Sequence, residues 1–193
     1  MRENVKEILE EKKRIFKELE KCGYAEQIEK IVDVMQVCLK SKHKILLAGN
    51  GGSAADAQHF AGEMVGRFLM EREAVSAIAL TTDSSVVTCI ANGYGYENVF
   101  ARQVEGLGVK GDIFVAISTS GNSENLVKAL QTAKEKEMFT VGFLGKDGGK
   151  MKDFCDYALI VPSESTPRIQ EIHTLTVHIL CELLEKGLFQ NRL

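Results

Sequence analysis

The chain has 193 residues, of which 45% are hydrophobic and 26% are charged, as in an ordinary soluble globular protein. Its formal net charge of -3 gives no electrostatic reason to expect nucleic acid or an anionic membrane as a partner. The first residues are charged, and no apolar run approaches the roughly 20 residues that span a bilayer. We therefore expect a cytoplasmic protein without a signal sequence or membrane anchor.

Cysteine usage supports the same compartment. The five cysteines are odd in number and scattered, and no C-x-x-C pair occurs. We expect them to be small apolar residues in a reducing environment.

Two helices are predicted before the repeating part of the chain. Residues 4–20 carry an apolar stripe that includes Val5, Ile8, Leu9 and Phe16, and a second helix is predicted over 25–39. The first helix must bury its stripe against its own domain or against another subunit. We expect one domain over 1–193, with an N-terminal helical arm at 1–24 and an α/β core at 25–193.

Strands and helices alternate from residue 44 onward. Strands are predicted at 45–48, 75–80, 112–117, 139–144 and 157–161. Helices are predicted at 53–67, 84–91, 97–107, 123–137, 150–155 and 167–186. Near-continuous apolar strands alternating with helices indicate a doubly wound, mostly parallel five-stranded α/β sheet covered on both faces.

The ends of these strands are rich in glycine and hydroxyl residues. Ligands of such sheets bind beyond the carboxyl ends of the strands. The segments expected to share one crevice there are 49–53, 81–83, 118–123, 145–149 and 163–166.

A glycine-rich turn after the first predicted strand opens a helix that carries His59 and Glu63. Exposed N–H groups and the helix dipole at such a turn favour an anion. The turn, N-G-G-S at 50–53, fits neither G-x-G-x-x-G nor G-x-x-x-x-G-K-[ST], which disfavours a dinucleotide-binding fold and a P-loop NTPase. His59 and Glu63 lie on one helix face, which suits a metal, an acid/base pair or an exposed polar pair.

A second loop, S-T-S-G-N-S at 118–123, packs four hydroxyls into six residues at a predicted strand–helix junction. Hydroxyl and N–H groups without a fixed charge suit a phosphate monoester held by many hydrogen bonds. A Ser/Thr turn with an N-cap would explain one or two of the hydroxyls but not all four. We therefore predict a phosphate-binding loop.

The final predicted helix adds Gln170 and His178, which are about two turns apart and can lean toward one cleft. His173 lies three residues from Gln170 and is a rival to His178, because spacing does not choose between the two histidines. His43 precedes a strand and is predicted to lie on the surface.

Four motifs follow one another between about residue 25 and the end of the sequence. They are G-N-G-G-S-A-A-D-A-Q-H-F at 49–60, S-T-S-G-N-S at 118–123, G-K-D-G-G at 145–149 and R-I-Q-E-I-H at 168–173. Together they resemble the sugar isomerase (SIS) domain family and, within it, the phosphoheptose isomerases. The resemblance implies a homotetramer with active sites between subunits, a zinc ion, and conversion of sedoheptulose 7-phosphate to D-glycero-D-manno-heptose 7-phosphate. Such a product feeds nucleotide-activated heptose for lipopolysaccharide, capsule or related surface glycans.

The resemblance also implies roles for single residues. The implied zinc ligands are His59, Glu63, Gln170 and His178, with Glu63 as base and His178 as acid. We expect the 50–52 turn to hold the sugar and the 118–123 loop to grip the phosphate. The full set of implied substrate contacts is Asn50, Gly51, Gly52, Ser53, Glu63, Asn92, Gly93, Ser118, Thr119, Ser120, Ser123 and Gln170.

The implied chemistry is coherent. Aldose–ketose isomerisation moves a proton between C1 and C2 through an enediol, which needs a base, an acid and a group that stabilises the enediolate. A Zn²⁺ ion that polarises the C1 and C2 oxygens would supply the last of these. His, Glu, Gln and His suit zinc, with about one ion per subunit, although Gln is a weak ligand.

One position departs from the family pattern. After Cys89-Ile90-Ala91 the family usually has Asn-Asp, whereas this chain has Asn92-Gly93. The missing carboxylate normally lies at the substrate hydroxyls, so its loss could weaken turnover, alter sugar preference or reflect an introduced substitution. Asp83 could compensate locally, but we expect it to be an N-cap or turn residue.

Two non-enzymatic functions are alternative hypotheses. Non-catalytic SIS proteins that bind the bacterial replication initiator resemble this chain at the glycine and serine loops but lack the equivalents of Glu63 and His178. Sugar-phosphate-sensing regulators keep the phosphate loops, need no metal set and carry a DNA-binding module, for which this chain has no extension. Both readings are weaker than the enzymatic one.

Overall fold

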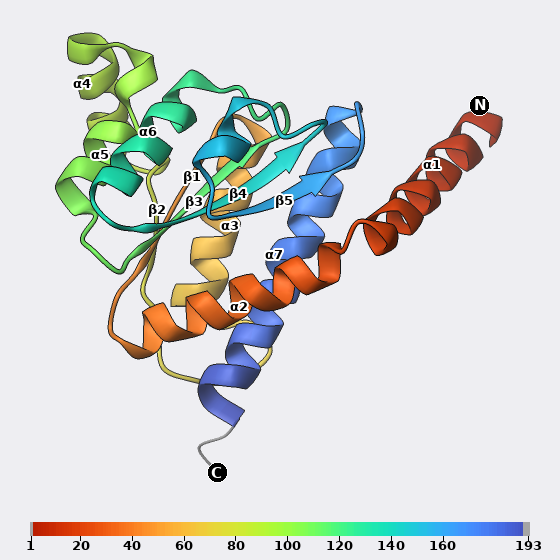
Figure 1. Cartoon of the computed structure of the whole chain (residues 1–193), viewed down its shortest axis with the longest axis horizontal. Coiled ribbons are helices and arrows are strands. Elements are labelled where there is room, and N and C mark those ends of the chain that lie inside the picture. Colours follow the sequence, from red (N-terminus) through yellow and green to blue (C-terminus); the bar gives the residue numbers. More distant parts are fainter. Residues whose placement is uncertain (1, 191–193) are drawn as a thin grey trace.

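Five parallel strands form the centre of the molecule in a computed structural model that describes residues 2–190 (Figure 1). Their order across the sheet is β2-β1-β3-β4-β5, and every neighbouring pair is parallel. The predicted five-stranded doubly wound sheet is thus confirmed, and it is parallel throughout. The strands are β1 (Ile45–Gly49), β2 (Ala77–Ala79), β3 (Ile113–Ser118), β4 (Phe139–Gly145) and β5 (Tyr157–Val161).

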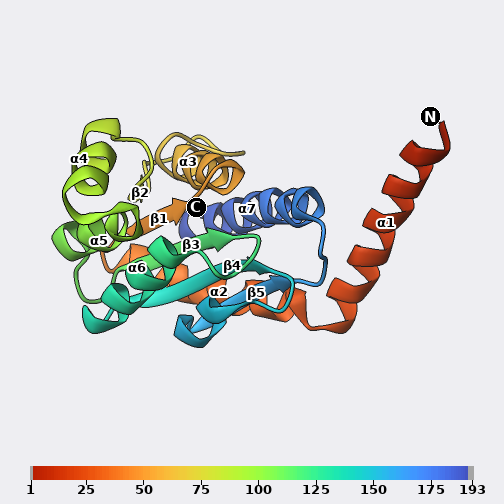
Figure 2. The ribbon, with the colours of Figure 1, turned by 90° about the horizontal axis from the view of Figure 1, so that it is seen from above.

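Helices cover both faces of the sheet (Figure 2). One apolar core joins the sheet to α2, α3 and α7, and the other joins it to α5 and α6, with α4 beside them. The helices are α1 (Arg2–Lys21), α2 (Tyr24–Lys40), α3 (Gly52–Val65), α4 (Ser84–Tyr94), α5 (Ala101–Leu107), α6 (Glu124–Glu135) and α7 (Thr166–Phe189), with 3₁₀ turns η1 (Tyr96–Asn98) and η2 (Lys150–Phe154).

Strand β3 shows why the strands read as unbroken apolar runs. Ile113, Val115 and Ile117 belong to one core, whereas Phe114 and Ala116 belong to the other. Because both faces of the strand are buried, alternation gives way to continuous hydrophobicity. This two-sided burial holds the carboxyl ends of β1 and β3 next to each other, where the candidate site lies.

Three predicted elements are corrected by the structure. The single helix predicted over 97–107 is divided into η1 and α5, because Val99 and Phe100 turn into the core between them. The strand predicted over 75–80 is shortened to β2, and the short helix predicted at 150–155 is the 3₁₀ turn η2.

Helix α1 projects away from the α/β body (Figures 1 and 2). Ile15 and Leu19 are buried where α1 meets α2, but Val5 is 59% exposed and Leu9 is 55% exposed. The predicted stripe is therefore only partly covered by its own chain.

Across residues 2–190, no helix combines the length and apolar character needed to cross a membrane. The five cysteines are free thiols. Burial raises the pKa of Cys38, Cys155 and Cys181 to about 12, so these thiols are unreactive at neutral pH.

Candidate active site

A polar pocket lies beyond the carboxyl ends of β1 and β3, the central neighbours from which the strand order runs in opposite directions. Open parallel sheets bind ligands at such a switch point. The lining side chains carry no formal charge. They belong to Asn50, Gly51, Gly52, Ser53, Ile117, Ser118, Thr119, Ser120, Ser123, Thr166 and Gln170.

Three helix N-termini meet at this pocket. Helix α3 begins at Gly52, α6 follows Ser123, and α7 begins at Thr166. Within the described residues, no side chain hydrogen-bonds to the first N–H groups of these three helices from its cap position. The absence of capping side chains and the three positive dipole ends therefore favour an anion, without any lysine or arginine in the lining.

Three serine hydroxyls of the 118–123 loop lie close together. The Ser118 Oγ lies 3.2 Å from the Ser123 Oγ and 3.5 Å from the Ser120 Oγ, and it accepts the Gly121 N–H at 3.1 Å. Ser123 occupies the N-cap position of α6 but makes no capping hydrogen bond with its side chain. The N-cap explanation therefore does not account for this serine, which leaves its hydroxyl available to a ligand.

The glycines of the 50–53 turn allow a close approach between two helices. Gly51 has φ 56°, a left-handed conformation that favours glycine. A Cβ atom on Gly52 would collide with the carboxamide of Gln170. Glycine at position 52 therefore lets Gln170 on α7 reach the start of α3.

Asn50 is held by two residues that sequence reasoning missed. Its side-chain amide exchanges hydrogen bonds with Asn125, at 3.0 Å and 2.9 Å, and the Tyr96 hydroxyl donates to its Oδ1 at 3.1 Å. Asn50 and Asn125 lie 75 residues apart, so no local pattern could have paired them. The two partners fix the direction in which Asn50 presents its amide to the pocket.

Farther from the pocket, the contact between α3 and α7, which we call the α3–α7 seam, contains three titratable side chains. They are His59 and Glu63 on α3 and His178 on α7. The His59 Nε2 lies 3.0 Å from the Glu63 Oε1. The His178 ring stands edge-on to His59, with centroids 5.0 Å apart, and stacks on Phe68 at 5.7 Å. The structure thus brings together His59, Glu63 and His178, although none of the three lines the polar pocket itself.

His173 is excluded from this group. Its ring is fully buried, and its Nε2–H donates to the Leu144 carbonyl at 3.1 Å. Burial lowers the pKa of His173 to about 4, so the ring is neutral at physiological pH. Of the two rival histidines, only His178 faces α3, whereas His173 ties α7 to the end of β4.

Three other predicted residues have clear positions. Asp83 is the N-cap of α4 and accepts the Val86 N–H at 2.9 Å, as expected. Asn92 and Gly93 lie at the end of α4, outside the pocket lining. A Cβ atom on Gly93 would meet no atom within 4 Å, so a longer side chain fits there.

The implied zinc ligands fit the ion by their chemistry. Two imidazole nitrogens, one carboxylate and one carboxamide oxygen are donors that zinc accepts. His59 and Glu63 are already adjacent. In the described part of the chain no three or more His, Cys, Asp and Glu side chains are arranged to hold a metal ion, so side-chain rotation would have to bring His178 and Gln170 to this pair.

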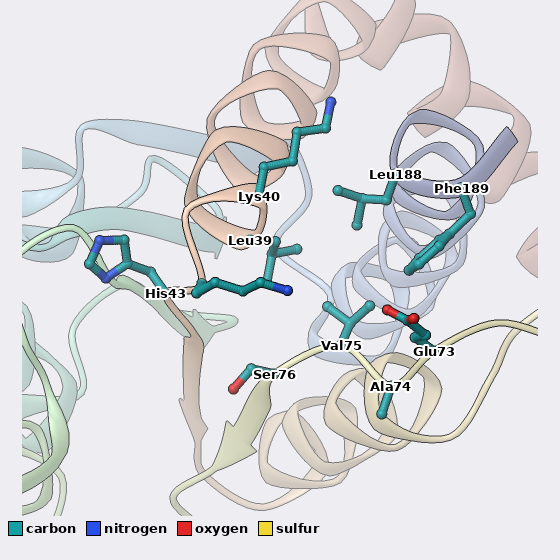
Figure 3. Close-up of a pocket in the computed structure, with 10 residues that line it drawn as sticks. Leu39, Lys40, His43, Glu73, Ala74, Val75, Ser76, Leu188 and Phe189 are labelled. Atoms are coloured by element: carbon teal, nitrogen blue, oxygen red, sulfur yellow. The ribbon is translucent and has the colours of Figure 1, made fainter. Parts of the chain in front are cut away.

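Figure 3 shows a second hollow, between the end of α2, the 73–76 segment and the end of α7. His43 and Ser76, which line it, precede β1 and β2, so it lies at the amino ends of the strands. The His43 Nδ1 lies 3.4 Å from the Oδ1 of the buried Asp112 at this end of the sheet. None of the implied site residues borders this hollow, so it is not the candidate active site.

The sequence and structure of this chain are similar to those of known proteins. Residues 7–145 match the SIS domain family. The phosphoheptose isomerase of Helicobacter pylori is 55% identical over 181 residues, which cover 94% of this chain and 93% of the relative. The phosphoheptose isomerase of Clostridium acetobutylicum is 52% identical over 185 residues, which cover 96% of this chain and 93% of the relative. A solved phosphoheptose isomerase from Neisseria gonorrhoeae superposes with a TM-score of 0.90 at 43% identity, covering 96% of this chain and 98% of that one.

Proposed function

The chain belongs to the phosphoheptose isomerases of the SIS domain family, and we propose that it converts sedoheptulose 7-phosphate to D-glycero-D-manno-heptose 7-phosphate. One observation carries this proposal. The pocket suited to an anion, whose lining side chains carry no charge, and the cluster of His59, Glu63 and His178 lie on the same two helices. The product would supply nucleotide-activated heptose for lipopolysaccharide, capsule or related surface glycans.

Binding would begin with the phosphate. The N–H groups at the starts of α3, α6 and α7 and the hydroxyls of the 118–123 loop would bind its oxygens. Asn50 and the 50–52 turn would hold the sugar, with Gln170 beside them. The substrate contacts proposed from the family are therefore Asn50, Gly51, Gly52, Ser53, Ser118, Thr119, Ser120, Ser123 and Gln170, with Glu63, Asn92 and Gly93 toward the sugar.

The proton transfer would take place at the α3–α7 seam. The Glu63 carboxylate would remove a proton from C1 of the ketose, and the resulting enediol would take the proton back at C2. His178 would donate a proton to the C2 oxygen as the carbonyl is lost, and it would take up the proton that the C1 hydroxyl releases as the aldehyde forms. His59, at 3.0 Å from Glu63, would orient the carboxylate.

A zinc ion held by His59, Glu63, Gln170 and His178 would polarise the sugar oxygens and stabilise the enediolate. We expect about one zinc per subunit. Replacing His59 or His178 by alanine should abolish zinc binding, whereas His43→Ala, at the other end of the sheet, should leave it unchanged. Retention of zinc by both site variants would contradict this ligand set.

The direct test of the function is to incubate the purified protein with sedoheptulose 7-phosphate and follow the aldose by NMR. Appearance of the aldose that depends on Glu63 supports the proposal. Tight binding of the sugar phosphate without isomerisation would instead favour a non-catalytic SIS protein.

We also propose that the protein forms a homotetramer, with the exposed part of α1 in a subunit interface. The support is the exposure of Val5, Ile8, Leu9 and Phe16 along one helix. Light scattering should report four subunits for the wild type and a smaller species for a Val5→Glu/Leu9→Glu double variant. The charge change Arg14→Glu, on the opposite face of α1, is the matched control.

A further inference from the structure

The α3–α7 seam ends in a buried charge pair that the proposed reaction does not use. The Arg72 Nε lies 2.9 Å from the Glu185 Oε1, and the two side chains are 2% and 3% exposed. A buried ion pair is weak evidence for stability, because desolvation offsets its attraction. Its purpose is therefore better judged from what the two side chains hold.

Glu185, on α7, binds the segment that follows α3. Its carboxylate accepts the N–H groups of Phe68, Leu69 and Met70 at 2.9, 2.8 and 3.0 Å. Burial alone would raise the pKa of Glu185, but these donors and Arg72 hold it below its ordinary value. An ionised Glu185 thus fastens three consecutive residues of this segment to α7.

Arg72 binds the end of α3. Its Nη2 donates to the Glu63 carbonyl at 2.7 Å, and its Nη1 donates to the Met64 carbonyl at 2.7 Å. The last carbonyls of a helix lack partners within the helix, and they carry the negative end of its dipole. The guanidinium satisfies two of them with a positive charge, and one of the two belongs to Glu63.

Both halves of the pair reach the residues of the α3–α7 seam. Arg72 holds the peptide group of Glu63, and Glu185 holds the backbone of Phe68, whose ring stacks on His178. Glu185 also follows His178 by about two turns, which places the two on one face of α7. At the other end of the seam, the Thr174 hydroxyl donates to the Asp56 Oδ1 at 2.8 Å.

We propose that Arg72 and Glu185 are positioning residues that set the distance between Glu63 on α3 and His178 on α7. The inference rests on the proposed function for the roles of Glu63 and His178. Apolar packing between two helices is not directional, whereas a guanidinium fork bonded to named carbonyls and to a fixed carboxylate specifies one register. A displacement of about 1 Å at a catalytic pair can cost about 10²-fold in rate.

The experiment uses two variants. Arg72→Lys keeps the positive charge but loses the guanidinium that bonds the two carbonyls, and Glu185→Gln removes the negative charge of the carboxylate. Histidine-ring NMR of the metal-free protein should show the His59 and His178 resonances shifted, because their ring contacts change. The His173 resonances should stay in place. Zinc affinity, measured by competition with a chelator, should fall about tenfold, and kcat should fall while KM for the sugar phosphate stays within about twofold.

The matched control is Asp112→Asn at the amino ends of the strands. Asp112 is also fully buried, accepts the N–H groups of Lys44 and Val109 at 3.0 and 2.9 Å, and pairs with the Lys44 Nζ at 2.6 Å. Its loss should lower the unfolding temperature without shifting the His178 resonances or the zinc affinity. The control therefore separates positioning from stability alone.

The outcomes are distinct. A folded Arg72→Lys protein with wild-type His178 resonances and wild-type zinc affinity would overturn the proposal. Failure of both variants to fold, with Asp112→Asn folded, would assign the pair to stability and also overturn it. If the wild type neither isomerises the sugar nor binds zinc, the proposed function fails, and the ring resonances of the metal-free variants still decide whether the pair sets the seam geometry.

Discussion

The polar pocket and the α3–α7 seam lie on the same two helices but are built in opposite ways. The pocket uses backbone N–H groups, hydroxyls and helix dipoles, and no charged side chain lines it. The seam depends on single titratable side chains, of which Glu63 and His59 are in hydrogen-bond contact. The proposed function therefore assigns binding and chemistry to different kinds of groups, with Gln170 common to both.

This difference has consequences for variants. A pocket made of many backbone donors loses affinity by small steps, because each hydrogen bond contributes only about 1 kcal/mol. A seam made of a few acid and base groups loses its chemistry with one substitution. We therefore expect pocket variants to change KM and seam variants to change kcat.

The largest effect is expected from Glu63→Gln. The carboxamide is nearly isosteric but cannot accept the C1 proton, so kcat should fall about 10³-fold while KM changes less than about twofold. Steady-state kinetics measures both. Glu182→Gln, an exposed carboxylate on α7 paired with Lys186, is the control and should behave as wild type. Wild-type turnover in Glu63→Gln would remove Glu63 from the role of base.

A second effect concerns His173, which anchors α7 between Gln170 and His178. Burial lowers its pKa from 6.5 to about 4, so between these values the unfolded chain binds a proton that the folded chain does not. Its contribution to stability is thus complete above about pH 6.5 and is lost as the pH falls toward 4. Between about pH 7 and pH 5 the free energy of unfolding should fall by about 2 kcal/mol on its account.

Urea unfolding of His173→Gln tests this assignment. Glutamine can keep a donor to the Leu144 carbonyl but does not titrate, so the variant should show a smaller loss of stability between about pH 7 and pH 5. An unchanged pH dependence would show that the wild-type loss comes from other groups.

The pocket is tested by Gly52→Ala. The added Cβ collides with the Gln170 carboxamide and displaces it. Because Gln170 is also a proposed zinc ligand, the variant is measured at saturating zinc, where KM should rise about tenfold, equivalent to about 1.4 kcal/mol, with a smaller change in kcat. Gly106→Ala in α5 is the control, because a Cβ there meets no atom within 4 Å. If Gly52→Ala lowered kcat and left KM unchanged, the separation between pocket and seam would break down.

The smallest effect is expected from Gly93→Asp, which restores the carboxylate of the family pattern in open space. If this carboxylate binds sugar hydroxyls, kcat/KM should rise about threefold, within the range of one hydrogen bond. Gly93→Asn has the same shape without the charge and should rise less. Equal kinetics for all three proteins would make the glycine incidental.

Most of the fold could be predicted from the residue pattern. Strands such as β3 and β4 are continuous apolar runs between polar loops, and the apolar residues of helices such as α6 recur at helical spacing, so short-range periodicity was enough. The split at Val99 and Phe100 was missed, because burial in the core overrode a continuous helical pattern.

The candidate site was predictable where its signals are local. The glycine turn, the serine loop and the His59–Glu63 spacing each occupy a few consecutive residues, and parallel strand ends bring the first two together. The choice between His173 and His178 was different. Both lie on one helix, and only the packing of α7 against β4 and α3 turns one ring inward and the other toward His59.

The residue types and their local spacing thus predict a parallel α/β sheet, an anion pocket at its strand ends and a titratable pair behind it. Tertiary structure alone decides the partners of those groups: Asn125 meets Asn50 across 75 residues, and Glu185 meets Arg72 across 113. The physical reason is the distance along the chain over which each interaction acts. Helix periodicity, turn chemistry and capping act within a few residues, whereas hydrogen bonds between distant side chains exist only after the sheet and its helices have packed.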